Sequence, residues 1–154
     1  MERYQGYLSA LAMHGVSRDE ALAPFGPFAY ETGLREGRRL LSLPEGERPT
    51  AVFAASDTTA IGVYEAARER GLMIPTDLSV FGFDDCDIAS WTTPGLTTVH
   101  QPLALMGGEA VRMVLNHAEG QLLQSAAPVQ LTTTLTVRAS TAPPTCQGTP
   151  PRSS

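Results

Sequence analysis

Residues 50–85 read TAVFAASDTTAIGVYEAARERGLMIPTDLSVFGFDD, and this stretch decides the fold. It opens on an apolar run at 51–55, continues through a helical pattern, and closes on a second apolar run at 78–83. The runs are about one βαβ repeat apart, which predicts two buried parallel strands joined by a helix. Ligands of open α/β folds bind at the carboxyl edge of the sheet. We therefore expect the polar residues that follow the two runs to gather at one ligand-binding edge: Ser56, Asp57, Asp84 and Asp85.

The helix between the two strands carries its own start and stop signals. Ser56 or Asp57 is placed to cap its first amides, and a carboxylate there suits the helix dipole. Gly71 provides a left-handed cap at the other end with Leu72 as its apolar contact, and Pro75 forbids resumption of the helix. Local and long-range signals thus agree on the βαβ unit.

The rest of the chain supplies further elements around this unit. Apolar spacing predicts a helix from Tyr4 to Ala12 that stops at Gly15, and a second helix over 29–43. A short strand is indicated at 21–25, another at 96–100, and an alternating one at 129–137. A helix over 103–118 is apolar around most of its circumference, so it expects burial on more than one side. We expect its partner to lie outside this chain, which leaves apolar surface exposed and predicts self-association or instability.

Composition excludes several classes of function. The formal net charge of -5 argues against a basic face that contacts nucleic acid directly. No apolar run is long enough to span a membrane and the start lacks a secretory segment, so a cytoplasmic protein is expected. Cys86 and Cys146 lack the spacing of a zinc site or a disulfide framework. We expect free thiols, no metal and no cofactor.

Four segments, taken in order, resemble the sensor domain of the lactose-repressor (LacI) family of transcription regulators. They are AVFAASDTTAIG, GLMIPTDLSVFGFDD, PGLTTVHQP and LTVRAST, and the resemblance runs from about Arg3 to Thr141. It implies a periplasmic-binding-protein-like sensor of two lobes that closes on a small effector and dimerises. In this family the sensor is joined to a helix-turn-helix head that binds DNA.

The resemblance also defines the domain organisation that we expect. The fold class is α/β, a parallel-sheet, three-layer lobe of the periplasmic-binding-protein-like fold that is incomplete. Residues 1–138 correspond to the carboxyl-terminal lobe, with a crossover segment at about 96–118 that returns to the other lobe. Residues 139–154 are rich in Pro, Ser and Thr, which predicts a disordered tail. The DNA-binding head, most of the other lobe and the strand before the first helix have no counterpart, so we interpret the chain as a fragment.

By this resemblance, Asp84 corresponds to the family's acidic effector ligand. A carboxylate at the end of a strand is able to accept two hydroxyl hydrogen bonds from a sugar. The alternative for Asp84 is a carboxylate that caps the short turn at 86–90, and we assign that capping role to Asp85. Arg3 corresponds to an arginine that forks onto polar effector groups, with a solvated arginine of the first helical turn as the alternative. Phe28 matches an aromatic position that stacks on effectors, and a core phenylalanine is its alternative.

Three further residues complete the expected effector site. Ser56 stands where relatives often have Asn, so a contact there is shorter and lacks the amide's donor and acceptor pair. Asp57 is more often a helix cap than a ligand at such a position. Gln101, on the crossover, matches a position that faces the cleft, with a polar hinge residue as its alternative. The departure at Ser56 leaves the class of effector open.

Three functions compete. The first is a non-enzymatic, effector-sensing and dimerising module of a LacI-type regulator, whose effector is a carbohydrate before nucleobases or other small polar molecules. Its partners are a second copy or a chain that supplies the missing lobe. The second is a transporter's solute-binding protein that lacks its signal and first lobe. The third is an enzyme built on Asp84 and Asp85 with Mg²⁺, or on Ser56 with Asp57 and one histidine, His14, His100 or His117. We reject it because Ser56 has no G-x-S-x-G elbow, the histidines sit on unrelated segments, and adjacent carboxylates point in different directions.

Overall fold

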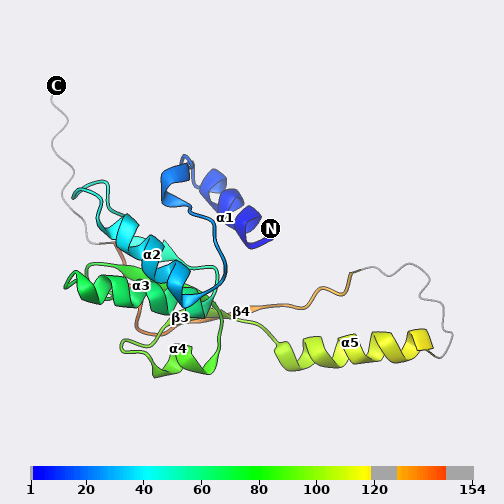
Figure 1. The fold of residues 1–154 in the computed structure, drawn as a ribbon. Helices are drawn as coiled ribbons and strands as arrows, with labels where there is room; N and C mark the ends of the chain where they lie inside the picture. The colour runs from blue at the N-terminus through cyan, green and yellow to red at the C-terminus, as the bar shows by residue number, and fades with distance from the viewer. Residues whose placement is uncertain (1, 119–127, 145–154) are drawn as a thin grey trace.

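The computed structural model describes residues 2–118 and 128–144, which form a mixed α/β unit (Figure 1). The strands of its sheet are, in both spatial and chain order, β1 (Ala51–Phe53), β2 (Ser79–Asp84), β3 (Thr97–His100) and β4 (Thr134–Thr136). β1, β2 and β3 run parallel, whereas β4 returns antiparallel to β3. The predicted α/β class and parallel strand pair are confirmed, and so is the strand at 96–100. The alternating strand at 129–137 is shorter than predicted.

Helix α3 (Asp57–Glu69) connects β1 to β2 with the predicted end signals. The Ser56 hydroxyl accepts the Thr59 N–H at 3.2 Å, so Ser56, and not Asp57, caps the helix. At the other end, Gly71 has φ 68° and the Leu72 N–H donates to the Ala67 carbonyl at 3.0 Å. This is the Schellman arrangement, in which a left-handed glycine satisfies the last helical carbonyls.

Helix α2 (Tyr30–Leu41) packs along α3, which in turn packs on the sheet (Figure 1). The two helices approach closely because Gly33 and Gly62 face each other's backbones. The core lies between α3 and the sheet and consists of apolar side chains that are almost fully buried: Leu41, Ala54, Ala60, Val63, Ala66, Ala67, Leu78, Val80, Ala89 and Leu96.

Of the three expected layers, the described residues show the sheet and a helical cover on one face. Phe53 and Phe81 pack their rings together, with centroids 5.3 Å apart, and Phe53 remains 42% exposed. β1 is an edge strand of the described sheet. The lobe is therefore partial, with an apolar sheet surface and a strand edge left uncovered by the described residues.

The first helix is confirmed as α1 (Glu2–Met13), and Gly15 ends it with φ 66°. The strand predicted at 21–25 is wrong, because Glu20–Leu22 form a single 3₁₀ turn, η1, capped by Asp19. A strand needs a neighbour to accept its backbone hydrogen bonds, and no described strand lies beside this segment.

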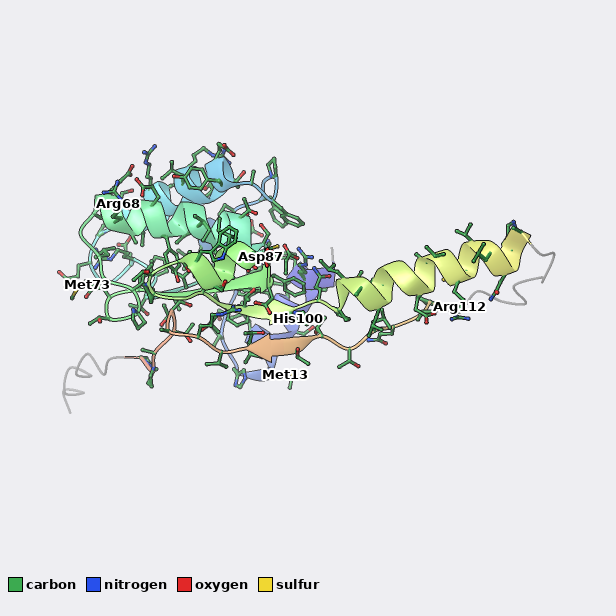
Figure 2. All side chains as sticks on the ribbon, turned by 90° about the horizontal axis from the view of Figure 1, so that it is seen from below. Met13, Arg68, Met73, Asp87, His100 and Arg112 are labelled. Carbon is green, nitrogen blue, oxygen red and sulfur yellow. The ribbon has the colours of Figure 1, made fainter. Side chains whose placement is uncertain are left out.

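Helix α5 (Leu103–Ala118) has the predicted bounds, and the described residues leave its apolar surface exposed, as expected of a helix whose partner lies outside this chain. It leaves the end of β3 and extends away from the sheet, so that Arg112 lies far from His100 (Figure 2). None of its residues is buried by the described part of the chain, and six of its large apolar side chains are exposed: Leu103, Leu105, Met106, Val111, Val114 and Leu115.

The start of the predicted tail at residue 139 is also wrong. Ser140 is completely buried, its hydroxyl donates to the Val80 carbonyl at 2.6 Å, and the Thr97 N–H donates to it at 2.8 Å. This one side chain bridges β2 and β3, which a composition rich in Pro, Ser and Thr does not reveal. The rest of the predicted tail, from residue 145, lies outside the described residues.

Candidate functional site

Three segments that are far apart in sequence meet at the end of β2. The Gln101 side-chain amide donates to Asp84 Oδ1 at 2.5 Å, and Arg3 Nη2 lies 3.3 Å from the same oxygen. Arg3 Nη1 also donates to the Ala55 carbonyl, just beyond β1, at 2.7 Å. Both side-chain contacts fall on Oδ1, and no described residue donates a hydrogen bond to Oδ2 of Asp84. The Asp84 side chain is 24% exposed, so this cluster has an unused acceptor at the sheet edge.

Two aromatic rings flank the Arg3 guanidinium. Its carbon lies 4.0 Å from the ring centroid of Phe83 and 5.3 Å from that of Phe28. A guanidinium held over ring faces at such distances is attracted by their quadrupoles. Phe28 is 62% exposed and is therefore not a core residue. The structure thus brings Phe28 to Arg3 and adds Phe83, which sequence reasoning missed although it directly precedes Asp84.

Ser56 and Asp57 lie beneath this edge and not on it. Ser56 is buried, and its hydroxyl pairs with the backbone N–H and hydroxyl of Thr59. Asp57 is completely buried, and it accepts the Cys86 N–H at 2.8 Å and the Thr98 hydroxyl at 2.5 Å. Gly82 makes room for it, since a Cβ there would lie 2.3 Å from Asp57 Oδ1. We correct the expected effector role of Asp57 to a structural one.

The electrostatics of Asp57 follow from this position. Burial raises the pKa of its carboxyl because the charged form loses its hydration. The two hydrogen bonds that it accepts act in the opposite direction, and the nearby carboxylates Asp84 and Asp85 raise the pKa further. Asp57 therefore links α3 to β3 and to the turn after β2 at an electrostatic cost.

The capping role expected for Asp85 is wrong. Helix α4 (Asp87–Trp91) has Cys86 as its N-cap residue and no side-chain cap. Asp85 instead accepts hydrogen bonds from three side chains: Arg138 at 2.8 Å, Thr136 at 3.1 Å and His100 at 3.1 Å. Burial raises the pKa of Asp85, but the hydrogen bonds from Arg138 and Thr136 and the charge of Arg138 outweigh it and lower the pKa. Asp85 and Arg138 are 53 positions apart, so sequence spacing did not reveal this pair.

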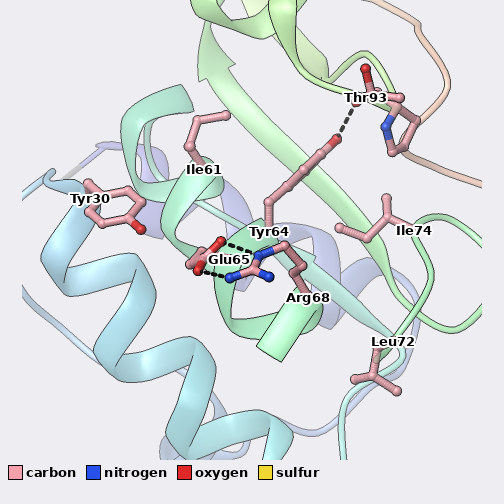
Figure 3. A pocket seen from close by; sticks show the side chains of 9 residues that line it. Tyr30, Ile61, Tyr64, Glu65, Arg68, Leu72, Ile74 and Thr93 are labelled. Atoms are coloured by element: carbon pink, nitrogen blue, oxygen red, sulfur yellow. Dashed lines mark hydrogen bonds and ion pairs between the residues drawn. The ribbon is translucent and has the colours of Figure 1, made fainter. Parts of the chain in front are cut away.

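The described surface includes two hollows of similar size. One, of about 380 Å³, lies between the end of β2 and the start of α5 and is lined by Asp84, Asp85, His100 and Gln101, with residues 102–105. The other, of about 320 Å³, lies on the outer side of α3 (Figure 3). Three of its polar side chains are already paired, Tyr64 with the Pro94 carbonyl and Glu65 with Arg68. The first hollow suits a polar ligand better, because Asp84 lines it and no described residue donates a hydrogen bond to Asp84 Oδ2.

The described residues contain no cluster of three potential ligand side chains that could hold a metal ion. Among them, no helix is both long and apolar enough to cross a bilayer.

Known proteins resemble this chain over most of its length. Residues 1–141 match the periplasmic binding protein-like domain family. The transcriptional repressor CytR of Escherichia coli K12 is 40% identical over 119 residues, which are 77% of this chain and 34% of the repressor. A LacI-family regulatory protein from Chloroflexus aggregans superposes with a TM-score of 0.82 at 36% identity, over 91% of this chain and 50% of that one. A complex of the regulator CelR with cellobiose gives 0.78 at 38% identity, over 90% and 42%. The chain thus spans about a third of the curated relative and at most half of these solved structures.

Proposed function

This chain belongs to the family of periplasmic-binding-protein-like domains, as the carboxyl-terminal part of the effector-sensing domain of a LacI-type regulator, and from this premise we propose that it binds a small polar effector, with a carbohydrate as the first candidate. The relatives regulate transcription, which disfavours the alternative of a transporter's solute-binding protein and supports a non-enzymatic, cytoplasmic role. Effector binding would shift a two-state equilibrium in the whole regulator, and such coupling is typically about 1 to 3 kcal/mol.

The observation that carries this proposal is the unused oxygen of Asp84. Oδ1 is occupied by Gln101 and Arg3, so the carboxylate is held in place while Oδ2 has no described donor. A sugar hydroxyl is a suitable donor for it. Phe28, exposed and lying against Arg3, offers a ring face to the apolar face of a pyranose. A relative solved with cellobiose supports the same class of ligand.

This lobe supplies only one side of the effector cleft, and its affinity for the effector is low without the other side. A hydrogen bond to a charged group contributes about 1.5 to 3 kcal/mol net. A millimolar dissociation constant corresponds to about 4 kcal/mol. Two such contacts at Asp84 and Arg3 therefore reach millimolar affinity without the second lobe that would exclude water.

Removing the charge of Asp84 is expected to abolish this binding. Asp84→Asn keeps the size of the side chain but turns a charged acceptor into a neutral one, a loss of about tenfold or more in affinity. Calorimetric titration of the chain with cellobiose should give a millimolar dissociation constant, and the variant should give no heat of binding. Asp87→Asn, an exposed carboxylate in the first turn of α4, is the matched control and should bind as the parent does. Equal affinity of parent and Asp84→Asn would contradict the proposal.

We also propose that the chain associates through α5, with itself or with a chain that supplies the other lobe. Isolated exposed apolar residues are ordinary, but six on one helix that no described residue covers favour an interaction surface. Sedimentation should show association that increases with concentration. Val111→Lys with Val114→Lys, exposed at 59% and 68%, should shift the chain to monomer. Met73→Lys, at 61% exposure away from α5, should not. A monomeric parent at every concentration would exclude association through this helix.

A further inference from the structure

The backbone at the end of β2 has an unusual conformation that needs support. Asp84 has φ 119° and Asp85 has φ 57°, and they are the two residues other than glycine with positive φ in the described chain. L-residues rarely adopt this region, and they remain there only where surrounding contacts hold them. At this turn the Asp84 carboxylate meets both Gln101 and Arg3.

Contacts hold the turn immediately after Asp84. The Cys86 N–H is fixed by Asp57, as described above. Both oxygens of Asp85 are engaged, since Arg138 binds Oδ1 while Thr136 and His100 bind Oδ2. The Asp85 side chain is only 14% exposed, so water has limited access to compete for these bonds.

Arg138 is itself fixed at several points. Its Nη1 donates to the Leu96 carbonyl at 2.9 Å, and its backbone N–H donates to the Thr97 hydroxyl at 3.0 Å. Its stem lies against Gly95, where an added Cβ would be 3.3 Å from Arg138 Cδ. The guanidinium is therefore anchored on the segment that leads into β3 and presents a rigid donor to Asp85.

We propose that Asp85 and Arg138 are positioning residues for the effector site, which fix the turn at Asp84 so that its carboxylate faces Arg3 and Gln101. This inference rests on the proposed role of Asp84. Neither residue needs to touch the effector. The segment after β4 thus sets the geometry of a site at the other end of the sequence, where Arg3 lies.

We call the hydrogen bonds of Asp85 with Arg138, Thr136 and His100 the Asp85 clamp. The competing explanation is that this clamp only stabilises the fold, and the Arg3 guanidinium distinguishes a stabilising role from a positioning role. Arg3 lies 4.0 Å from the Phe83 ring centroid while it contacts Asp84, so ring current and restricted exchange mark its Nε–Hε resonance. The Asp84→Ala variant gives the position of the Arg3 Nε–Hε resonance when the Asp84 carboxylate is removed. If Asp85 positions Asp84, Asp85→Asn shifts the Arg3 resonance to the Asp84→Ala position. If Asp85 only stabilises the fold, melting temperature falls and the Arg3 resonance stays.

The variants remove different numbers of the Asp85 contacts, so that at least one variant remains folded. Thr136→Val removes one bond of the clamp and should give a partial shift of the Arg3 resonance. Arg138→Met should match Asp85→Asn, and Arg138→Lys, which keeps the charge, should recover part of the shift. The control is Glu69→Gln, which breaks the exposed fork to Arg38, with bonds of 2.6 and 2.7 Å, and should leave Arg3 unchanged.

Cellobiose affinity provides the second measurement. We expect Asp85→Asn to bind at least tenfold more weakly than the parent, with Glu69→Gln unchanged. A parent that binds no cellobiose, with an Arg3 resonance that still moves in Asp85→Asn, would reject the carbohydrate effector and retain the positioning role. An Arg3 resonance that is the same in the parent, Thr136→Val and Asp85→Asn would overturn the positioning role.

Discussion

Gly62→Ala should destabilise the chain strongly, with an expected loss of about 4 kcal/mol in the free energy of unfolding. The added Cβ would lie 2.2 Å from the Tyr30 carbonyl oxygen and 2.5 Å from the Leu34 nitrogen. Both are backbone atoms of α2, so no side chain is able to rotate away and the helices must separate. Overpacking usually costs about 1 to 3 kcal/mol, and a clash of the new Cβ with fixed backbone atoms belongs above that range. Domains of this kind have only about 5 to 15 kcal/mol in total.

Urea denaturation measures this loss, and a second glycine in a helix supplies the control. Gly6 lies in α1, and its added Cβ would meet no heavy atom within 4 Å. Gly6→Ala should therefore be neutral or more stable by up to about 1 kcal/mol, since alanine favours a helix. A Gly62→Ala chain as stable as Gly6→Ala would mean that α2 and α3 do not pack as described.

Asp57→Ala is the second substitution with a large expected effect, about 3 kcal/mol of destabilisation. It leaves the Thr98 hydroxyl and the Cys86 N–H without their acceptor in the interior. Each unsatisfied buried group costs about 1 to 3 kcal/mol, partly offset because a buried charge is removed. Asp57→Asn should be much milder, because its amide oxygen accepts one of these bonds and its NH₂ group donates to the Thr98 oxygen. Equal stability of the Ala and Asn variants would contradict this account.

The pH dependence of stability provides an independent check on Asp57. Because its native pKa is raised, the folded chain holds this proton to a higher pH than the unfolded chain does. The contribution of the Asp57 pKa shift to the free energy of unfolding is therefore fully present below the unfolded pKa of about 3.9. It is lost as pH rises through the native pKa. The free energy of unfolding of the parent, relative to Asp57→Asn, should decline across this interval. A difference that is constant with pH would show that Asp57 is not buried as a titrating group.

The βαβ unit was predictable because several local signals agree there. Ser56, Gly71 and the two apolar runs each point to the same boundaries, and α5 was predicted at its observed ends. The helical start at Ser56 did not reveal that Asp57 is buried, because a capping carboxylate and a buried one occupy the same place in the sequence. The burial depends on Thr98, which is 41 positions away.

Contacts between distant segments limited the prediction of the site. Asp84, Arg3, Phe28 and Gln101 were named by resemblance, and the structure brings these four together. The Asp85 clamp could not be read from spacing, since its main partner is Arg138, from the segment after the last strand. The apolar circumference of α5 predicted a helix whose partner lies outside this chain, and among the described residues nothing covers it.

The most direct test of the central claim is a backbone amide titration of the chain with cellobiose, followed by NMR. If the end of β2 is the wall of the effector site, shifts should concentrate at Ala55, Asp84 and Gln101, saturate in the millimolar range, and vanish in Asp84→Asn. Shifts that concentrate instead around Tyr64 in the hollow outside α3, or no shifts at any attainable concentration, would contradict the assignment of Asp84 as a carbohydrate-binding carboxylate.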